Sequence, residues 1–181
     1  KTRSPPVHEN LRNANLAHLV DVHYERTSYI WFLKKKIESL TVSDDPQKYD
    51  FVFLDGAHDW YVDGFAFFLV DKLLREGGTI LFDDYAWTYE KSPTHSTLER
   101  VKDMPDDERT EPHIGKVFDL LVKQHPSYSD FRIINNHWAF ARKTRAEDAA
   151  PVRTERRITM GIPVAVRAGR FMKRRVKHTA V

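Results

Sequence analysis

The sequence has 181 residues, 41% of them hydrophobic and 30% charged, which predicts one domain with a sizeable core and a tail. The absence of cysteine excludes disulfides, a thiol nucleophile and a Cys-ligated zinc site. No signal peptide is recognisable and no apolar run approaches the roughly 20 residues of a membrane span, so we expect a protein of a reducing compartment, located in the cytoplasm.

The first predicted elements are a short helix at Val7–Ala14, an alternating strand at Leu19–Tyr24 and a helix at Ser28–Leu40. The apolar side of the second helix groups four residues, Tyr29, Phe32, Leu33 and Ile37. A polar loop, Thr41–Lys48, then leads to the next strand.

The centre of the chain predicts a strand at Phe51–Leu54, a helix at Trp60–Arg75 and a strand at Thr79–Phe82. Helical spacing places four apolar residues on one face of the helix: Phe65, Phe68, Leu69 and Leu73. Gly77 and Gly78 are expected to end this helix in the left-handed conformation. Strand, helix and strand in this length indicate a right-handed βαβ unit with parallel strands.

Acidic residues follow both central strands. Asp55 comes after the first strand, and Asp83 and Asp84 come after the second. Ligands of parallel sheets lie at the carboxyl ends of the strands, so the three acids predict an active site there.

The rest of the domain begins with a long loop, Ala86–Glu111, of the length that functional lids have. A helix is predicted at His113–Gln124, with Val117, Leu120 and Leu121 inward. Two antiparallel strands, Phe131–Asn135 and His137–Arg142, are expected around a turn at Asn135-Asn136.

The last part of the chain is a basic tail. From Lys143 onward there are eleven basic residues and three acids, a charge of +8 that leaves −5 of the total +3 in residues 1–142. We therefore divide the chain into a domain, residues 1–143, and a tail, residues 144–181, with a linker at Thr144–Arg157 and an amphipathic helix at Pro163–His178. The tail is either a solubilising segment or a contact for an anionic membrane, nucleic acid or a protein partner. The membrane alternative implies a peripheral membrane protein.

Four stretches of the chain carry a family resemblance: YDFVFLDGAH, LLREGGTILFDDY, IGKVFDLLVKQHP and FRIINNHWAFARK. They resemble class I S-adenosylmethionine (SAM)-dependent methyltransferases, and most of all the metal-dependent O-methyltransferases of the catechol, caffeoyl-CoA, macrocin and cephalosporin-tailoring types. The resemblance covers roughly residues 7–143. It implies a Rossmann-like α/β fold with a parallel sheet and a carboxyl-terminal antiparallel strand pair. It also implies methyl transfer to a hydroxyl group of a small molecule.

The same resemblance implies residue roles. Asp55, Asp83 and Asp84 match the metal ligands of the family, and three carboxylates suit Mg²⁺ or another hard divalent cation. His58 stands where catechol-type enzymes carry a catalytic lysine, and a neutral imidazole accepts a hydroxyl proton. Asp55 and Ser28 are the expected contacts to SAM. Related enzymes are often dimers or larger, which makes a homo-oligomer an expected assembly.

Other roles are open for these residues from the sequence alone. Asp55 is a candidate helix N-cap, Asp84 a turn residue, and His58 a metal ligand or an exposed residue at a helix start. Four aromatic residues near the predicted site either line a substrate pocket or pack in the core: Trp60, Tyr61, Trp87 and Tyr89.

One family feature is not found in the sequence. The family binds the cofactor on a glycine-rich turn after its first strand, whereas the first glycine here is Gly56. We therefore expect the sequence to begin after the second strand of the fold, as the carboxyl part of a longer enzyme, so that Phe51–Leu54 has an unpaired edge. Two further hypotheses follow: a non-catalytic remnant that binds partners through its basic tail, and a nucleic-acid methyltransferase whose tail contacts phosphates.

Overall fold

The computed structural model describes residues 6–42 and 47–144. The predicted helix at Pro163–His178 and nearly all of the basic tail lie outside the described residues, as do residues 1–5 and 43–46. Within the described part, no helix is long and apolar enough to cross a bilayer.

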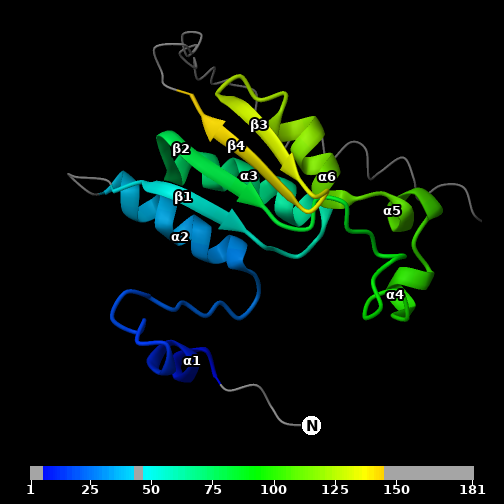
Figure 1. Cartoon of the computed structure of the whole chain (residues 1–181), viewed down its shortest axis with the longest axis horizontal. Coiled ribbons are helices and arrows are strands. Elements are labelled where there is room, and N and C mark those ends of the chain that lie inside the picture. Colours follow the sequence, from blue (N-terminus) through cyan, green and yellow to red (C-terminus); the bar gives the residue numbers. More distant parts are fainter. Residues whose placement is uncertain (1–5, 43–46, 145–181) are drawn as a thin grey trace, which may run out of the picture. The chain divides into compact units, whose positions relative to one another are not determined.

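A mixed sheet of four strands forms the framework (Figure 1). The strands are β1 (Tyr49–Leu54), β2 (Leu74–Phe82), β3 (Tyr128–Ile134) and β4 (Trp138–Lys143). Their order is β1-β2-β4-β3, in which β1 and β2 are parallel and β4 is antiparallel to both β2 and β3. The predicted βαβ unit with parallel strands and the predicted antiparallel strand pair are confirmed.

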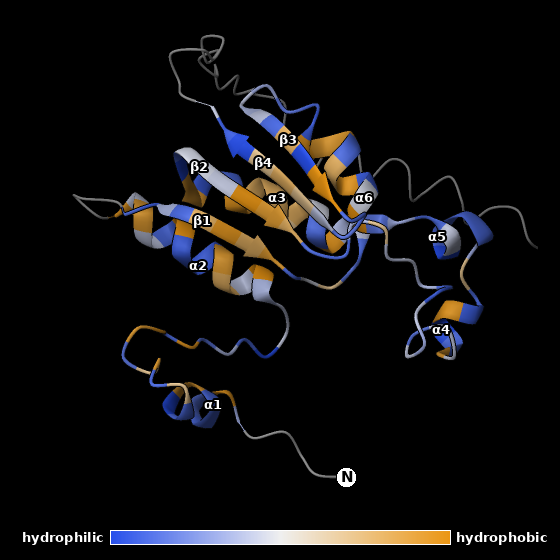
Figure 2. Ribbon diagram, in the orientation of Figure 1, coloured by the Kyte–Doolittle hydropathy of each residue, from blue (hydrophilic) through white to orange (hydrophobic). Residues whose placement is uncertain are grey.

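Six α-helices and one π-helical turn accompany the sheet in the described residues. They are α1 (Val7–Asn13), α2 (Tyr29–Thr41), α3 (Trp60–Leu73), α4 (Glu99–Lys102), α5 (Asp106–Thr110), α6 (His113–Val117) and η1 (Phe118–Val122). One apolar core joins α3, α6 and η1 to the sheet, and α2 packs against it through Tyr29, Ile30 and Leu33. Figure 2 shows the hydrophobic colouring that β1, the second half of β2 and α3 share.

Helix α3 buries a different face from the predicted one. Its buried residues are Asp63, Gly64, Ala66, Phe67, Val70 and Leu73. Phe65 and Phe68 of the predicted apolar face are 54% and 45% exposed, whereas Leu73 of the same face is buried. Apolar residues occur around most of this helix, so the period of 3.6 did not define one face. The packing of Phe67 against Phe82 of the sheet selected the buried side.

The predicted stop of this helix at Gly77 and Gly78 is also wrong. The helix ends at Leu73, and Leu74 is already extended as the first residue of β2. Gly77 has a φ of 74° and lies inside β2, where the pairing with β1 shifts between Tyr49 and Phe51. Its left-handed conformation therefore forms a strand irregularity, which glycine tolerates without steric cost.

The predicted strand at Leu19–Tyr24 does not form. This segment has no ladder partner, and Leu19 and Tyr24 are each 69% exposed. A strand is stable only when a neighbour satisfies its backbone groups, so alternation by itself was insufficient. In the described residues β1 pairs with β2 alone, and Phe51 and Phe53 are 51% and 49% exposed, as expected for an unpaired edge.

The predicted helix at His113–Gln124 is confirmed, but one inward residue is not. Val117 is fully buried, whereas Leu120 is 48% exposed and Phe118 takes an inward position. The second half of this segment is the π-turn η1, in which the Lys123 amide donates to the Phe118 carbonyl at 2.9 Å. The wider turn rotates the following side chains away from the α-helical register.

Candidate functional site

The site begins with the loop that joins β1 to α3. Asp63 in the first turns of α3 is fully buried, and its carboxylate accepts hydrogen bonds from the amides of Ala57 (3.2 Å) and Asp59 (2.8 Å) and from the Tyr29 hydroxyl. A Cβ at Gly56 would overlap this carboxylate and lie 2.6 Å from the Tyr29 hydroxyl oxygen, so only glycine fits there. One buried acid thus fixes the backbone that carries Asp55 and His58.

Asp63 was not predicted as a site residue. The available signal was an acid inside a strongly apolar helix, because a buried carboxylate needs hydrogen-bond donors. Burial and the hydrogen bond to Asp63 raise the pKa of Tyr29 above its ordinary value, so this hydroxyl stays a donor.

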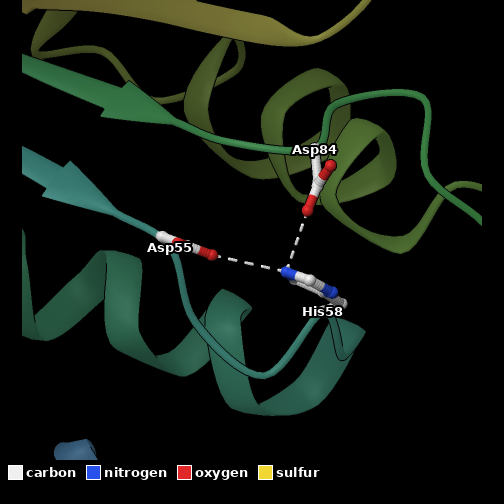
Figure 3. Close-up of side chains that lie close together, drawn as sticks. All are labelled: Asp55, His58 and Asp84. Atoms are coloured by element: carbon white, nitrogen blue, oxygen red, sulfur yellow. Dashed lines mark hydrogen bonds and ion pairs between the residues drawn. The ribbon is translucent and has the colours of Figure 1, made fainter. Parts of the chain in front are cut away.

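The His58 side chain lies beyond the carboxyl ends of the two central strands, between Asp55 and Asp84 (Figure 3). Its Nε2 is 3.4 Å from Asp55 Oδ1 and 3.1 Å from Asp84 Oδ2. The residue has a φ of 57°, a left-handed conformation that is uncommon outside glycine. The Trp87 ring packs on the imidazole, with the ring centroids 4.8 Å apart. Loop conformation and packing together hold the imidazole at the carboxylates.

Asp83 and Asp84 extend the end of β2. The Asp83 amide donates to the Leu54 carbonyl at 3.2 Å, which continues the pairing with β1. Asp84 has a φ of 54°, and its carbonyl accepts from the Trp87 amide at 3.0 Å. The alternative that Asp84 is a turn residue is therefore confirmed, and its side chain also belongs to the site.

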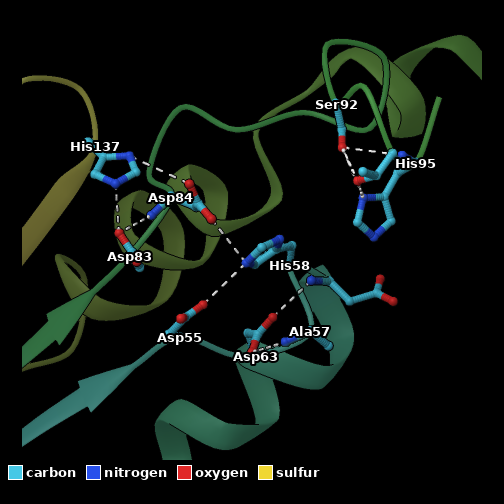
Figure 4. A network of polar contacts seen from close by, with 11 residues as sticks. Asp55, Ala57, His58, Asp63, Asp83, Asp84, Ser92, His95 and His137 are labelled. Atoms are coloured by element: carbon cyan, nitrogen blue, oxygen red, sulfur yellow. Dashed lines mark hydrogen bonds and ion pairs between the residues drawn. The ribbon is translucent and has the colours of Figure 1, made fainter. Parts of the chain in front are cut away.

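A second histidine completes the cluster (Figure 4). His137 Nε2 is 3.0 Å from Asp83 Oδ1, and its Nδ1 is 3.5 Å from Asp84 Oδ1. His137 follows the turn at Asn135 and Asn136, whose φ angles are 54° and 52°. His137 was not predicted from the sequence, because only the position of β4 beside β2 brings the turn to the acids.

The predicted acids thus fall into two compact groups that share Asp84. In one group Asp55, His58 and Asp84 have ligand atoms within 4.8 Å of one another, and in the other Asp83, Asp84 and His137 do. Among the described residues, no such group contains Asp55 and Asp83 together. Both groups consist of carboxylate oxygens and imidazole nitrogens, which are suitable ligands for a divalent cation.

The structure identifies the N-caps of α3 and α2, which bear on Asp55 and Ser28. The N-cap of α3 is Asp59, so the alternative that Asp55 caps this helix is wrong. Ser28 is the N-cap of α2, where its Oγ accepts from the Ile30 amide at 3.3 Å. The hydroxyl hydrogen of Ser28 is still able to bind another acceptor.

The aromatic residues near the cluster have different positions. Tyr89 is fully buried and packs on Trp87 and on His113, with centroid distances of 4.8 and 5.2 Å. Trp60 and Tyr61 are 37% and 64% exposed and line a surface cavity of about 330 Å³. Tyr89 is therefore core packing, and Trp60 and Tyr61 are the members of the set that border an open cavity.

His113 attaches the segment after β2 to α3. Its Nδ1 accepts from the Trp60 amide at 3.1 Å, so its Nε2 is the protonated nitrogen and donates to the Glu108 carbonyl at 2.7 Å. The histidine is 5% exposed. Both ring nitrogens are used inside the protein, which makes His113 a structural residue.

A family comparison shows that the part of the chain that carries most of this site is similar to methyltransferases. Residues 3–85, which include Asp55, His58, Asp83 and Asp84, match the model of a family described as a methyltransferase domain. The predicted resemblance to SAM-dependent methyltransferases is confirmed over these residues. No curated protein matches the chain.

Solved structures of O-methyltransferases are also similar to this chain. One is an O-methyltransferase from Bacillus cereus in complex with SAH, with 19% identity and a TM-score of 0.46 over 76% of this chain and 56% of that chain. Another is a putative caffeoyl-CoA O-methyltransferase from Staphylococcus aureus, with 19% identity and a TM-score of 0.48 over 75% and 56%. A third is TomG from Streptomyces achromogenes, with 19% identity and a TM-score of 0.45 over 76% and 55%. The chain spans little more than half the length of these proteins.

Proposed function

We propose that the protein is a SAM-dependent O-methyltransferase that acts with a divalent cation, Mg²⁺ first, on a hydroxyl group of a small molecule. The observation that carries the proposal is the Asp55–His58–Asp84 group, whose ligand atoms lie within 4.8 Å at the carboxyl ends of two parallel strands. This is the part of a parallel sheet where ligands bind. The match of residues 3–85 to a methyltransferase domain supports the reaction class.

Asp55, Asp83 and Asp84 are the proposed cation ligands. Their side chains are partly accessible, with exposures of 54%, 19% and 22%, so a hydrated cation reaches them from solvent. A bound divalent cation lowers the pKa of a coordinated hydroxyl group and so favours its ionisation. The three acids would hold the cation at the end of the sheet, where it would supply this ionisation.

His58 is the proposed acceptor of the hydroxyl proton. Its Nε2 faces both Asp55 and Asp84, so a proton on this nitrogen is hydrogen-bonded to carboxylate. Nδ1 is then the unprotonated nitrogen, and the carboxylates orient the ring for proton transfer as in other base–carboxylate pairs. The alternative role, in which Nε2 is a cation ligand, uses the same geometry.

Ser28 and Asp55 are the proposed contacts to SAM, which supplies the methyl group. Asp55 directly follows β1, and Ser28 is the N-cap of α2. Tyr29 of α2 donates to the Asp63 carboxylate, which also accepts from the backbone of the loop after Asp55. Their shared neighbourhood supports one cofactor contact surface. The substrate class is limited to small molecules with a hydroxyl group.

Isothermal titration of the 181-residue chain with SAM, with and without Mg²⁺, tests the proposal. We expect cofactor binding, and Mg²⁺ binding that is lost in Asp84→Asn, because asparagine tolerates the left-handed conformation but lacks the charge. Asp50→Asn is the matched control, since Asp50 lies near the opposite end of β1 and is paired with Arg75. A folded sample that binds neither SAM nor Mg²⁺ would refute the proposal.

The partner and location predictions are also proposals. We propose a cytoplasmic protein whose basic tail binds anionic vesicles, nucleic acid or a protein partner. This binding should disappear when residues 144–181 are removed. Unchanged binding after this truncation would exclude a role of the tail. Analytical ultracentrifugation tests the proposed homo-oligomer.

A further inference from the structure

His137 projects from the turn between β3 and β4 toward the acids of β2. The backbone around it is fixed independently of its side chain. The His137 amide donates to the Ile134 carbonyl at 3.0 Å, and the His137 carbonyl accepts from the Tyr85 amide at 2.8 Å. The Ala86 amide donates to the Asn136 carbonyl at 3.1 Å. The first bond closes the turn, and the other two hold the turn to the segment that follows Asp84, so the position of the imidazole is set by the sheet.

Both nitrogens of this imidazole face carboxylates. The closest separations are 3.0 Å from Nε2 to Asp83 Oδ1 and 3.5 Å from Nδ1 to Asp84 Oδ1. The two carboxylate oxygens of Asp84 face different histidines: Oδ2 faces His58 and Oδ1 faces His137. The two histidines therefore contact different oxygens of the same carboxylate (Figure 4).

We propose that His137 is a nitrogen ligand of a divalent cation held by Asp83 and Asp84, and that it gives the site a preference for a transition-metal ion such as Co²⁺ or Zn²⁺ over Mg²⁺. The inference rests on the proposed function, with which it shares the cation ligands Asp83 and Asp84, and it changes the ion expected at them. Nothing in the sequence pattern assigned a role to His137.

The separations within the group agree with shared coordination. Neighbouring ligands of an octahedral ion with bonds of about 2.1 Å lie about 3 Å apart, which is close to the distance between His137 and Asp83. The His137 side chain is 48% exposed, so an ion from solvent reaches its nitrogens.

The ligand types determine the expected ion. Mg²⁺ favours oxygen ligands and keeps several waters, whereas imidazole favours later transition metals. In a site of two carboxylates and one imidazole, the nitrogen therefore adds much more to the affinity for Co²⁺ or Zn²⁺ than to the affinity for Mg²⁺. His137 therefore controls the affinity for Co²⁺ or Zn²⁺, and through it the selectivity against Mg²⁺.

Titration of the chelator-treated 181-residue chain with Co²⁺ and with Mg²⁺ tests this inference. His137→Ala removes the ligand, and His137→Gln keeps a hydrogen-bond donor near Asp83. We expect both variants to lose at least about tenfold in Co²⁺ affinity, since even residues that only orient metal ligands contribute tenfold or more. The Mg²⁺ affinity should stay within about twofold. His8→Gln in α1 is the control, because His8 contacts the ring of Tyr24 and belongs to neither group of candidate ligands.

Pulsed EPR of bound Mn²⁺ gives a second readout, since coupling to the His137 nitrogen should be present in the wild type and absent in His137→Gln. Equal losses of Co²⁺ and Mg²⁺ affinity, or recovery of Co²⁺ binding in His137→Gln, would show a residue that only positions the acids and would overturn the inference. In that case the cation site of the proposed function stands. If the folded wild-type chain binds neither ion, the cation site itself fails and the inference fails with it.

Discussion

Replacement of Asp63 by asparagine should destabilise the protein and loosen the loop that carries Asp55 and His58. Asp63 is fully buried and accepts from two backbone amides, Ala57 and Asp59, through different carboxylate oxygens. Asparagine has nearly the same shape but only one acceptor oxygen. In either orientation its NH₂ group faces one of these amides, so a buried donor stays unpaired.

The size of the effect follows from these bonds. An unpaired buried donor costs about 1–3 kcal/mol, and each remaining bond to a neutral acceptor is weaker by about 1 kcal/mol than one to a charged acceptor. Relief of the buried charge offsets part of this cost. We therefore expect Asp63→Asn to lower the free energy of unfolding by about 2–3 kcal/mol.

Urea unfolding of the 181-residue chain, followed by circular dichroism, measures the change. Asp50→Asn is the control, because Asp50 has a 77% exposed side chain and its pair with Arg75 is expected to contribute less than about 1 kcal/mol. If Asp63→Asn unfolds within about 0.5 kcal/mol of the wild type, the carboxylate does not hold the loop and the reasoning is wrong.

Three further predictions concern the same region and its neighbours. Gly56→Ala should destabilise the fold by about 2 kcal/mol or more, measured by the same unfolding assay, because its Cβ would displace Asp63 or Tyr29; an effect below about 0.5 kcal/mol would contradict the packing. His58→Gly should be about 1 kcal/mol more stable to unfolding than His58→Ala, because a φ of 57° costs conformational free energy in alanine but not in glycine. Both variants should lose methyl transfer. Equal stabilities would argue against this backbone conformation. Burial and the hydrogen bond to Asp119 raise the pKa of Tyr85 to about 12, so its contribution to stability is complete below about pH 10 and is lost as the pH rises from 10 to 12. Unfolding measured across this range should show a smaller decline in Tyr85→Phe, and an identical decline would refute the assignment.

The sequence by itself determined the features that depend on neighbouring residues. The predicted apolar runs Phe51–Leu54 and Thr79–Phe82 lie within β1 and β2 and end where these strands end, and three acids follow the strands: Asp55, Asp83 and Asp84. The Asn135-Asn136 turn was predictable because asparagine tolerates positive φ. These features result from local chain preferences, which the order of residues encodes directly.

The tertiary structure decided the features that depend on distant partners. Alternation at Leu19–Tyr24 did not produce a strand, because no neighbouring strand is present among the described residues to satisfy its backbone. The buried face of α3 was chosen by contact with the sheet, since the helix is apolar around most of its surface. Local pattern is ambiguous in both cases, and only long-range packing resolves it.

The site shows the same division. Asp55, His58 and Asp84 were predicted from residues within one βαβ unit, and the structure brings them together. His137 is far from them in sequence, and it reaches Asp83 and Asp84 only because β4 inserts between β2 and β3. The sequence therefore determined which acids end the parallel strands, and the strand order decided which histidines face them.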